Sequence, residues 1–501
     1  MTALDWGLPA DGRGTWSYDE IPPSDRGQKA LGRHGGRYPP LHYDLLRGVY
    51  APLRWASDAG RIELDPRARD TALRLSGRLV SVLMAVGCVY LVYRIARLLL
   101  ASREGALLAA AIAALPVPFV RFAKTVNLDV PYTFWFALSL YFLLRLLDRQ
   151  RWRDYLAFGV AMALAIGTKD QAAGLYLAVP FLIVPALGAE LGRRGVRRPY
   201  LRAAFDPRPL AAVVLALLLF ALVHRLFFGL DDFRDHLRVM FGKGSSGRND
   251  FAPTLAGQLQ MALASLRQIA FSLGWPLAVA AFAGIVVAAR ERRFRMLSLL
   301  ALPAGYFLAF IAPILHVRVR WWIPTVLLLA PFAALALTRL LAWQRPPRGV
   351  RLAGVGAVLV YSLALPVCLD LQMLADSRYR VEAWLAANLR PGERWLGVAA
   401  YPQLTVRGTD PIGWGRLERR GRRELERREL DYLVVNRDDP SITKASQALA
   451  ALDAGEWGYV EVFRYRANPC CGLPDWSGVS TVLHTVNPEF SIFRRVPDDS
   501  R

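Results

Sequence analysis

The sequence has little cysteine and few charged residues for its length. Only 4 of its 501 residues are cysteines, and two of these, Cys470 and Cys471, are adjacent, so no CxxC pair marks a zinc or redox framework. Charged residues make up 21% of the chain, below the roughly 25% of soluble domains, and hydrophobic residues make up 54%. This composition excludes a disordered, a collagen-like and a disulfide-rich secreted protein.

Acidic residues are scarce too, and the excess of basic residues is confined to the middle of the chain. The net charge is +22, from 63 Lys and Arg against 41 Asp and Glu. Residues 1–74 and 371–501 carry +1 each, whereas residues 75–370 carry +20. A nucleic-acid-binding protein does not normally concentrate its basic charge in its most apolar region. We therefore expect a polytopic membrane protein with no nucleic-acid partner.

Long apolar runs fill the middle of the chain, and about 20 apolar residues suffice for a helix to cross a bilayer. The sequence predicts a mainly α-helical, polytopic transmembrane domain over residues 75–370, with about 10 crossings. The expected crossings are 75–100, 104–122, 129–147, 155–169, 171–189, 209–229, 268–289, 296–314, 322–342 and 350–370. The fourth is short and rich in Ala and Gly, which favours packing inside the bundle.

Basic residues alternate between the connecting loops and predict the orientation. One set of alternate loops holds 21 Lys and Arg and the other set holds 10. Because basic loops stay on the cytoplasmic side, both ends of the chain are expected on the outer face of the plasma (inner) membrane. The outer tail lacks an apolar run of its own, so we expect a further crossing encoded upstream of Met1.

Both flanks of the membrane domain have a recognisable organisation. Residues 1–74 form a first outer loop, in which apolar residues at spacings of three and four over 40–55 predict an amphipathic helix lying along the membrane. Residues 371–501 combine a helix-like stretch at 378–389 with short strand-like runs, and predict a small extracytoplasmic α/β domain. Its Arg- and Glu-rich run, 416–430, is expected to be a solvated helix.

Two outer loops carry carboxylates suited to catalysis. Asp19 and Glu20 lie in the first loop, where one of them could act as a general base. The alternative is an ordinary solvated acidic pair. The second loop runs from Arg121 through Lys124 to Asp129 at a predicted helix start, where Asp129 could serve the site or simply cap the helix.

Cations also occur at outer helix ends, where they are disfavoured without an anionic partner. They are Lys169, next to Asp170, and the pair Arg318 and Arg320. One interpretation is contact with lipid headgroups or with Asp170; the other is recognition of a phosphate by a Lys point charge and an Arg fork. The nearby Arg225 is expected to reach the membrane surface along its own stem.

Several of these motifs follow one another in a familiar order. Asp19-Glu20 precedes Tyr-Pro-Pro-Leu-His42-Tyr, then Arg74-Leu-Ser, then Phe-Val-Arg-Phe-Ala before Asp129-Val-Pro, and finally Gly-Thr-Lys169. This order resembles the membrane glycosyltransferases of GT-C type, in particular the family-39-like group with protein O-mannosyltransferases, the lipid A aminoarabinose transferase and RgtA/B/C/D-like enzymes. The resemblance covers roughly residues 15–190, and more loosely extends to about 345.

The resemblance implies an inverting transfer of a sugar from a polyprenyl-phosphate donor to an outer-face lipid, glycan or protein acceptor. Asp19 would be the catalytic base. Substrate-binding residues would be Glu20, His42, Lys124, Asp129, Lys169, Arg318 and Arg320. Some enzymes of this type use a divalent metal, but no additional acidic cluster in the sequence demands one. The alternative from another class is a transporter or flippase of lipid-linked sugars, and a structural membrane scaffold is a more distant one.

Overall fold

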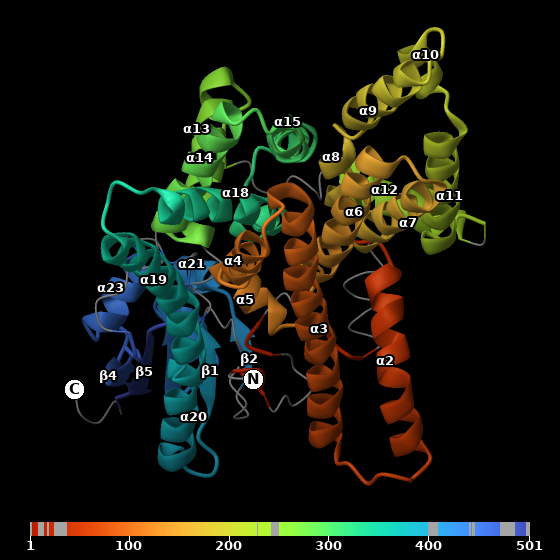
Figure 1. Cartoon of the computed structure of the whole chain (residues 1–501). Helices are drawn as coiled ribbons and strands as arrows, with labels where there is room; N and C mark the ends of the chain where they lie inside the picture. Colours follow the sequence, from red (N-terminus) through yellow and green to blue (C-terminus); the bar gives the residue numbers. More distant parts are fainter. Residues whose placement is uncertain are drawn as a thin grey trace. The chain divides into compact units, whose positions relative to one another are not determined.

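The computed structural model describes residues 3–8, 15–17, 20–24, 38–227, 229–241, 250–398, 409–439, 442, 446–470 and 486–496. The chain divides into two compact units (Figure 1). The bundle unit consists of Ile21–Ala59 and Ser76–Pro366. The C-terminal unit consists of Met1–Glu20, Gly60–Leu75 and Val367–Arg501, so that the first outer loop is shared between the two units.

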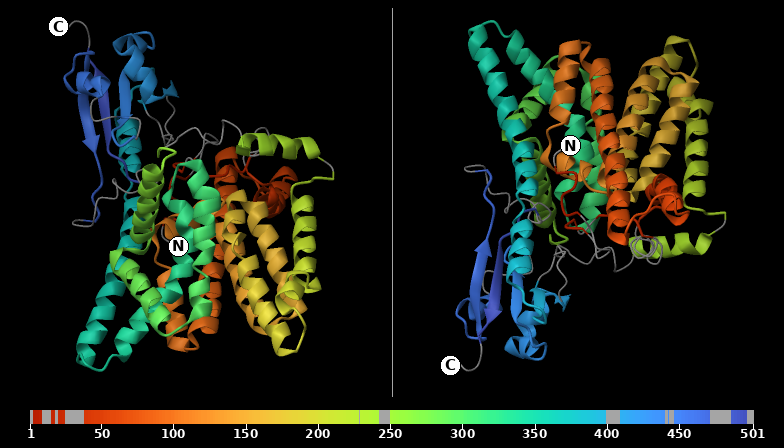
Figure 2. Two further views of the ribbon diagram at one scale, coloured as in Figure 1. Left: turned by 90° about the horizontal axis from the view of Figure 1, so that it is seen from above. Right: turned by 90° about the horizontal axis from the view of Figure 1, so that it is seen from below.

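Long apolar helices make up the bundle unit, because nearly every residue of its membrane segments favours burial in protein or lipid. Figure 2 shows α6, α7 and α11, coloured orange to yellow-green, lying next to one another. The helices are α2 (Leu41–Asp58), α3 (Pro66–Leu100), α4 (Arg103–Ala113), α5 (Val117–Ala123), α6 (Asp129–Arg149), α7 (Trp152–Thr168), η2 (Asp170–Ala172), α8 (Ala173–Tyr176), α9 (Pro180–Arg193), α10 (Pro199–Ala204), α11 (Pro207–Val223), α12 (Leu230–Phe241), α13 (Leu255–Leu273), α14 (Trp275–Arg290), α15 (Phe294–Ser298), α16 (Ala301–Tyr306), η3 (Phe307–Ile311), α17 (Ala312–Ile314), η4 (Val319–Trp322), α18 (Ile323–Ala342) and α19 (Arg348–Leu374).

The predicted polytopic, mainly helical fold is confirmed. Among the described residues, seven helices are long and apolar enough to cross a membrane, and nine spans result if each of two bent pairs counts as one. The expected crossing at 155–169 corresponds to α7, whose 17 residues fall just short of that length. Its buried residues are mainly Ala and Gly together with Tyr155 and Phe158, which agrees with packing inside the bundle on that side.

The two bent pairs have local causes. Helices α4 and α5 meet at 68° where Pro116, which cannot continue a helix, precedes Pro118. Helices α13 and α14 meet at 111° at Gly274, whose φ of +79° lies in the left-handed region that favours glycine. The expected crossing at 268–289 therefore covers parts of two differently directed helices.

The predicted amphipathic helix is α2. Its buried side is formed by His42, Tyr43, Leu46 and Tyr50. Its Asp44 carboxylate pairs with Arg225 at 2.9 Å and with Arg47 at 2.9 Å. Arg225 therefore pairs with α2, where the sequence predicted that it reaches the membrane surface alone.

A mixed sheet forms the centre of the C-terminal unit, as the predicted α/β domain requires. Its strands are β1 (Trp395–Val398), β2 (Thr409–Ile412), β3 (Tyr432–Asn436), β4 (Tyr459–Tyr465) and β5 (Phe490–Arg495). Their order is β2-β1-β3-β5-β4. Strand β1 is parallel to β2 and β3, whereas β5 is antiparallel to β3 and β4. The helices are α20 (Ser377–Asn388), α21 (Trp414–Arg420), α22 (Arg422–Glu426) and α23 (Gln447–Asp453).

Alternation along β3, all of whose residues are buried, gives the sheet two cores. Tyr432 and Val434 pack with α20, and Leu433 and Val435 pack with α21 to α23. The helix expected at 378–389 is thus α20, displaced by one residue.

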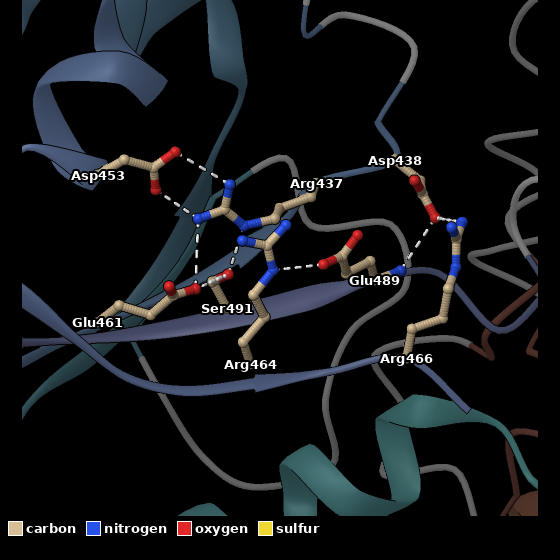
Figure 3. A network of polar contacts seen from close by, with 8 residues as sticks. All are labelled: Arg437, Asp438, Asp453, Glu461, Arg464, Arg466, Glu489 and Ser491. Carbon is tan, nitrogen blue, oxygen red and sulfur yellow. Dashed lines mark hydrogen bonds and ion pairs between the residues drawn. The ribbon is translucent and has the colours of Figure 1, made fainter. Parts of the chain in front are cut away.

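Arginine networks cover the surface of this unit. Figure 3 shows Arg437 beside Asp453, Glu461 and Ser491, with hydrogen bonds of 3.1 Å to Asp453 and 2.5 Å to Ser491. In the same view Arg464 pairs with Glu489, and Arg466 with Asp438.

The run 416–430 differs from the solvated helix that the sequence predicts. It breaks at Gly421, whose φ is +52°, into α21 and α22. The break buries the Glu424 carboxylate among four arginines, Arg416, Arg420, Arg427 and Arg428, at 3.0 to 3.2 Å. Burial alone raises the pKa of Glu424, but the arginine hydrogen bonds outweigh it and lower that pKa to about 2.

A disulfide joins Cys368, near the end of α19, to Cys470. No short sequence motif indicates this bond, because the two cysteines are 102 positions apart. Cys88 is a free, buried thiol.

Candidate functional site

The hairpin of α6 and α7 brings Asp129 and Lys169 together. Asp129 is the first residue of α6, and Lys169 directly follows the last residue of α7. Gln150, in the left-handed region, ends α6 two positions before α7 begins, so the two helices run antiparallel. Lys169 Nζ lies 2.6 Å from Asp129 Oδ1, and both residues are at least 95% buried.

Asn127 takes over the capping role that was one interpretation of Asp129. Its side-chain Oδ1 accepts a hydrogen bond of 2.7 Å from the Asp129 backbone N–H. Its Nδ2 is held by Thr125 Oγ1 at 2.7 Å, which fixes the loop before α6. The Asp129 carboxylate is therefore directed at Lys169 and is not needed as a cap.

Arg320 is the second cation beside Asp129. It lies in the short helix η4, and its Nε is 3.8 Å from Asp129 Oδ2. Aromatic rings flank both cations: Arg320 Cζ is 5.9 Å from the Phe122 ring, and Lys169 Nζ is 5.2 Å from the Tyr132 ring. We call Asp129, Lys169 and Arg320 the charged triad.

Two further buried polar residues near the charged triad, Tyr132 and Gln171, were not among the residues that the sequence predicted for the site. The Tyr132 hydroxyl accepts a 2.9 Å hydrogen bond from Gln171 Nε2, and both residues are buried. Tyr132 lies one helical turn after Asp129, and Gln171 lies two residues after Lys169. These spacings in the sequence could have indicated Tyr132 and Gln171 as site residues, because they place both residues at the hairpin end that holds the charged triad.

Arg318 separates from Arg320 although only one residue lies between them. Its Nε donates to His316 Nε2 at 3.0 Å, and His316 Nδ1 contacts Asp250. Arg318 thus belongs to a different chain of polar contacts. Lys169 likewise does not use its neighbour Asp170, whose carboxylate contacts His236 Nε2 at 3.2 Å.

The first outer loop reaches the same region at Ile21. The Ile21 backbone N–H donates a 2.7 Å hydrogen bond to the carbonyl of Val126, three residues before Asp129. Asp19, the expected base, lies outside the described residues. Glu20 is buried and accepts a 2.5 Å hydrogen bond from the Thr15 hydroxyl.

Within the described residues, the ring nitrogens of His42 make no hydrogen bond to the charged triad. His42 is buried on α2, and neither ring nitrogen has a hydrogen-bond partner in the described part of the chain. Burial lowers its pKa to about 3, so the ring is neutral at physiological pH. Lys124 caps the end of α5.

No group of three His, Cys, Asp or Glu side chains that could hold a metal ion occurs among the described residues. The charged triad offers one carboxylate and two cations, a composition suited to an anion and unsuited to a metal ion.

Comparison with known proteins gives one family match. Residues 72–224 match the family of dolichyl-phosphate-mannose-protein mannosyltransferases, a range that includes Asp129 and Lys169. No curated protein matches the chain significantly.

Three solved structures are similar over most of the chain. ArnT from Cupriavidus metallidurans in the apo state is 15% identical, with coverage of 98% of this chain and 96% of that chain and a TM-score of 0.44. The same protein bound to undecaprenyl phosphate is 16% identical, with 98% and 95% coverage and a TM-score of 0.42. The archaeal oligosaccharyltransferase AglB from Archaeoglobus fulgidus, in complex with an inhibitory peptide and a dolichol-phosphate, is 14% identical, with 90% and 69% coverage and a TM-score of 0.41.

The family match coincides with the hairpin that builds the charged triad, and it confirms the resemblance drawn from the sequence motifs. Residues 72–224 match the dolichyl-phosphate-mannose-protein mannosyltransferase family, and this match indicates a polytopic membrane glycosyltransferase of GT-C type.

Proposed function

We propose that this glycosyltransferase moves a sugar from a polyprenyl-phosphate carrier to a hydroxyl acceptor on the outer face of the membrane, with inversion at the anomeric carbon. The observation that carries the proposal is the charged triad, in which two buried cations lie beside the carboxylate of Asp129. The triad lies at the end of the α6–α7 hairpin, inside and beside the region that matches the family.

The triad's net charge of +1 favours an anion. Lys169 and Arg320 are both more than 90% buried, so water screens them poorly and a phosphate placed beside them is attracted strongly. Arg320 can offer two parallel donors to phosphate oxygens, and Lys169 adds a compact point charge. Asp129 holds both cations in place before the donor binds.

The proposed reaction needs one base and no general acid. The Asp19 carboxylate accepts the proton of the acceptor hydroxyl while that oxygen forms a bond to the anomeric carbon. The bond from this carbon to the phosphate oxygen breaks, and the polyprenyl phosphate leaves with the electron pair. Lys169 and Arg320 stabilise the negative charge that develops on the leaving phosphate.

Support for Asp19 comes from the chain that follows it. Ile21, two residues later, is hydrogen-bonded to Val126 in the loop that leads into Asp129. This contact ties the chain that follows Asp19 to the loop that begins α6. Glu20 would shape the acceptor side, whereas His42, Lys124 and Arg318 would contribute more remotely to substrate binding.

We also propose that the C-terminal unit and the active site face the outside of the plasma membrane. The Cys368–Cys470 disulfide supports this orientation, because disulfides persist in oxidising extracytoplasmic compartments and are rare in the cytosol. The excess of Lys and Arg in the opposite set of loops agrees with it.

The decisive assay uses the purified full chain in nanodiscs with undecaprenyl-phosphate monosaccharides and a panel of lipid, glycan and peptide acceptors. A new glycosidic bond is the expected product, whereas movement of the headgroup across proteoliposomes without bond formation would identify a flippase. Arg320→Lys is expected to weaken binding of undecaprenyl phosphate about tenfold, since a point charge replaces the fork. Arg318→Lys is the matched control and is expected to have a smaller effect, because Arg318 is engaged with His316.

A further inference from the structure

The N-terminal segment that leads to Asp19 is held by a cluster of buried side chains in the C-terminal unit. Trp6 Nε1 donates a 3.0 Å hydrogen bond to Asp376 Oδ2. The Arg378 guanidinium lies 5.3 Å from the Trp6 ring and 4.7 Å from the Trp16 ring. We call Trp6, Trp16, Asp376 and Arg378 the tryptophan anchor; all four are at least 98% buried.

Asp376 and Arg378, which contact the N-terminal segment, are held in place by hydrogen bonds to each other and to the backbone of the C-terminal unit. Asp376 caps α20 by accepting from the Arg378 backbone N–H at 3.1 Å, and its carboxylate pairs with the Arg378 guanidinium at 2.5 and 2.7 Å. It also accepts from the backbone N–H of Asn487 at 2.9 Å. A buried ion pair that is also hydrogen-bonded to the backbone is costly to disturb, so it presents an ordered surface for the two indoles.

The aromatic packing fits the segment closely. Trp16 lies edge-on against Trp6 at 6.1 Å and against Tyr379 of α20 at 4.5 Å. Gly7, with φ of +72°, passes so close that a Cβ there would be 3.0 Å from Trp16 atoms. Both the backbone conformation and the space therefore require glycine at this position.

The anchor ends directly before the proposed base. Ser17 and Glu20 flank the position of Asp19 in the sequence, and the Glu20 backbone N–H donates to the Ser17 carbonyl at 3.0 Å. The Thr15 hydroxyl holds the Glu20 carboxylate at 2.5 Å. Glu20 is thus tied to Thr15 and Ser17, the two sequence neighbours of Trp16.

We propose that the C-terminal unit orients the catalytic loop through the tryptophan anchor, and that Trp6, Trp16, Asp376 and Arg378 are positioning residues for transfer. The proposal rests on the proposed function, in which Asp19 is the base. A base gains its effect from a fixed distance to the acceptor hydroxyl, and a misplacement of about 1 Å can cost roughly 100-fold in rate. The donor phosphate is bound by other residues, so loosening the anchor slows turnover without weakening donor binding.

The test compares Trp16→Ala and Trp6→Phe with Trp384→Phe in the full chain in nanodiscs. Trp384 is the matched control. It is a tryptophan of the same unit, on α20, but among the described residues its ring packs against Tyr432 and Phe463 in the core of that unit and not against the N-terminal segment. Turnover, donor KM and hydrogen exchange of peptides covering residues 3–20 are measured for each variant. The milder Trp6→Phe removes the indole donor to Asp376 and part of the ring but keeps an aromatic side chain, so it tests the anchor even where Trp16→Ala folds poorly.

For Trp16→Ala we expect kcat to fall by about 10- to 100-fold, donor KM to change less than about threefold, and exchange protection at residues 15–17 to be lost. Trp6→Phe is expected to show the same pattern more weakly, and Trp384→Phe none of it. Unchanged kcat or unchanged protection in both anchor variants would overturn the proposal, as would an equal response in Trp384→Phe. Asp19→Asn is measured alongside: full turnover there would contradict the proposed base itself, whatever the anchor variants do.

Discussion

Because Lys169 pairs with Asp129, replacing both residues together should affect the stability of the protein and its turnover differently. At 2.6 Å and an effective dielectric constant of about 20, their attraction is about 6 kcal/mol, against about 4 kcal/mol for Arg320 at 3.8 Å. Desolvation of the buried charges offsets most of this attraction. Removing one partner alone is nevertheless expected to cost about 3–5 kcal/mol, because it leaves the other charge poorly compensated.

A double-mutant cycle separates the two roles. Lys169→Met should lower the thermal stability of the protein in nanodiscs. Adding Asp129→Asn should restore part of it, since the poorly compensated carboxylate is then gone while the buried Arg320 loses a nearby anion. Transfer and binding of undecaprenyl phosphate should stay lost in the double variant, because the phosphate has lost a cation. Loss of donor stabilisation of this kind is expected to reduce turnover by about 10²- to 10³-fold.

The same hairpin offers a matched control at its other end. Arg145 on α6 pairs with the buried Asp154 on α7 at 2.8 Å. The double variant Arg145→Met, Asp154→Asn should recover both stability and turnover. If the Asp129, Lys169 double variant also regained normal turnover, the pair would be purely structural, and the assignment of the phosphate site would be refuted.

Three further outcomes follow from burial and charge. Burial holds the pKa of His42 at about 3, below the roughly 6.5 of the unfolded chain, so the stability of the protein should decline as the pH falls from about 6.5 toward 3. His42→Gln should flatten this decline in melting curves measured against pH, and an unchanged pH dependence would contradict the prediction. Glu424→Gln should destabilise the C-terminal unit by roughly 1–3 kcal/mol at pH 7, and the difference in stability from wild type should vanish between about pH 4.5 and 2. Glu426 is paired only at the surface, so Glu426→Gln should change the stability little. Reduction of the Cys368–Cys470 bond should lower the stability of the protein by about 2–4 kcal/mol. Thiol labelling of unreduced protein from cells should leave both cysteines unmodified, whereas ready labelling without reductant would place them in the cytosol.

Local sequence patterns predicted the features that depend on local physics. Apolar length gave the membrane helices, and spacings of three and four gave α2 with its buried His42 and Leu46. The motifs around Asp129 and Lys169 indicated candidate residues, and the short loop between α6 and α7 brings the start of α6 beside the end of α7.

Features that join distant parts of the chain were not readable from the sequence. Trp6 meets Asp376 across 370 positions, and Arg225 meets Asp44 across 181. Neither pair belongs to a local period, so only tertiary packing decides it. The separate partners of Arg318 and Arg320 show the same point on a smaller scale, because the chain entering η4 directs Arg318 to His316 and Arg320 to Asp129.

The most direct test of the central claim is single-turnover transfer by Asp19→Asn in nanodiscs, with the donor saturating and the acceptor fixed. Asparagine keeps the size and most hydrogen bonds of the side chain but cannot accept the acceptor's proton. We expect transfer to fall by about 10²-fold or more, with donor binding and melting temperature unchanged. Near-normal transfer by Asp19→Asn would contradict the account of an outer-face carboxylate base working beside Lys169 and Arg320.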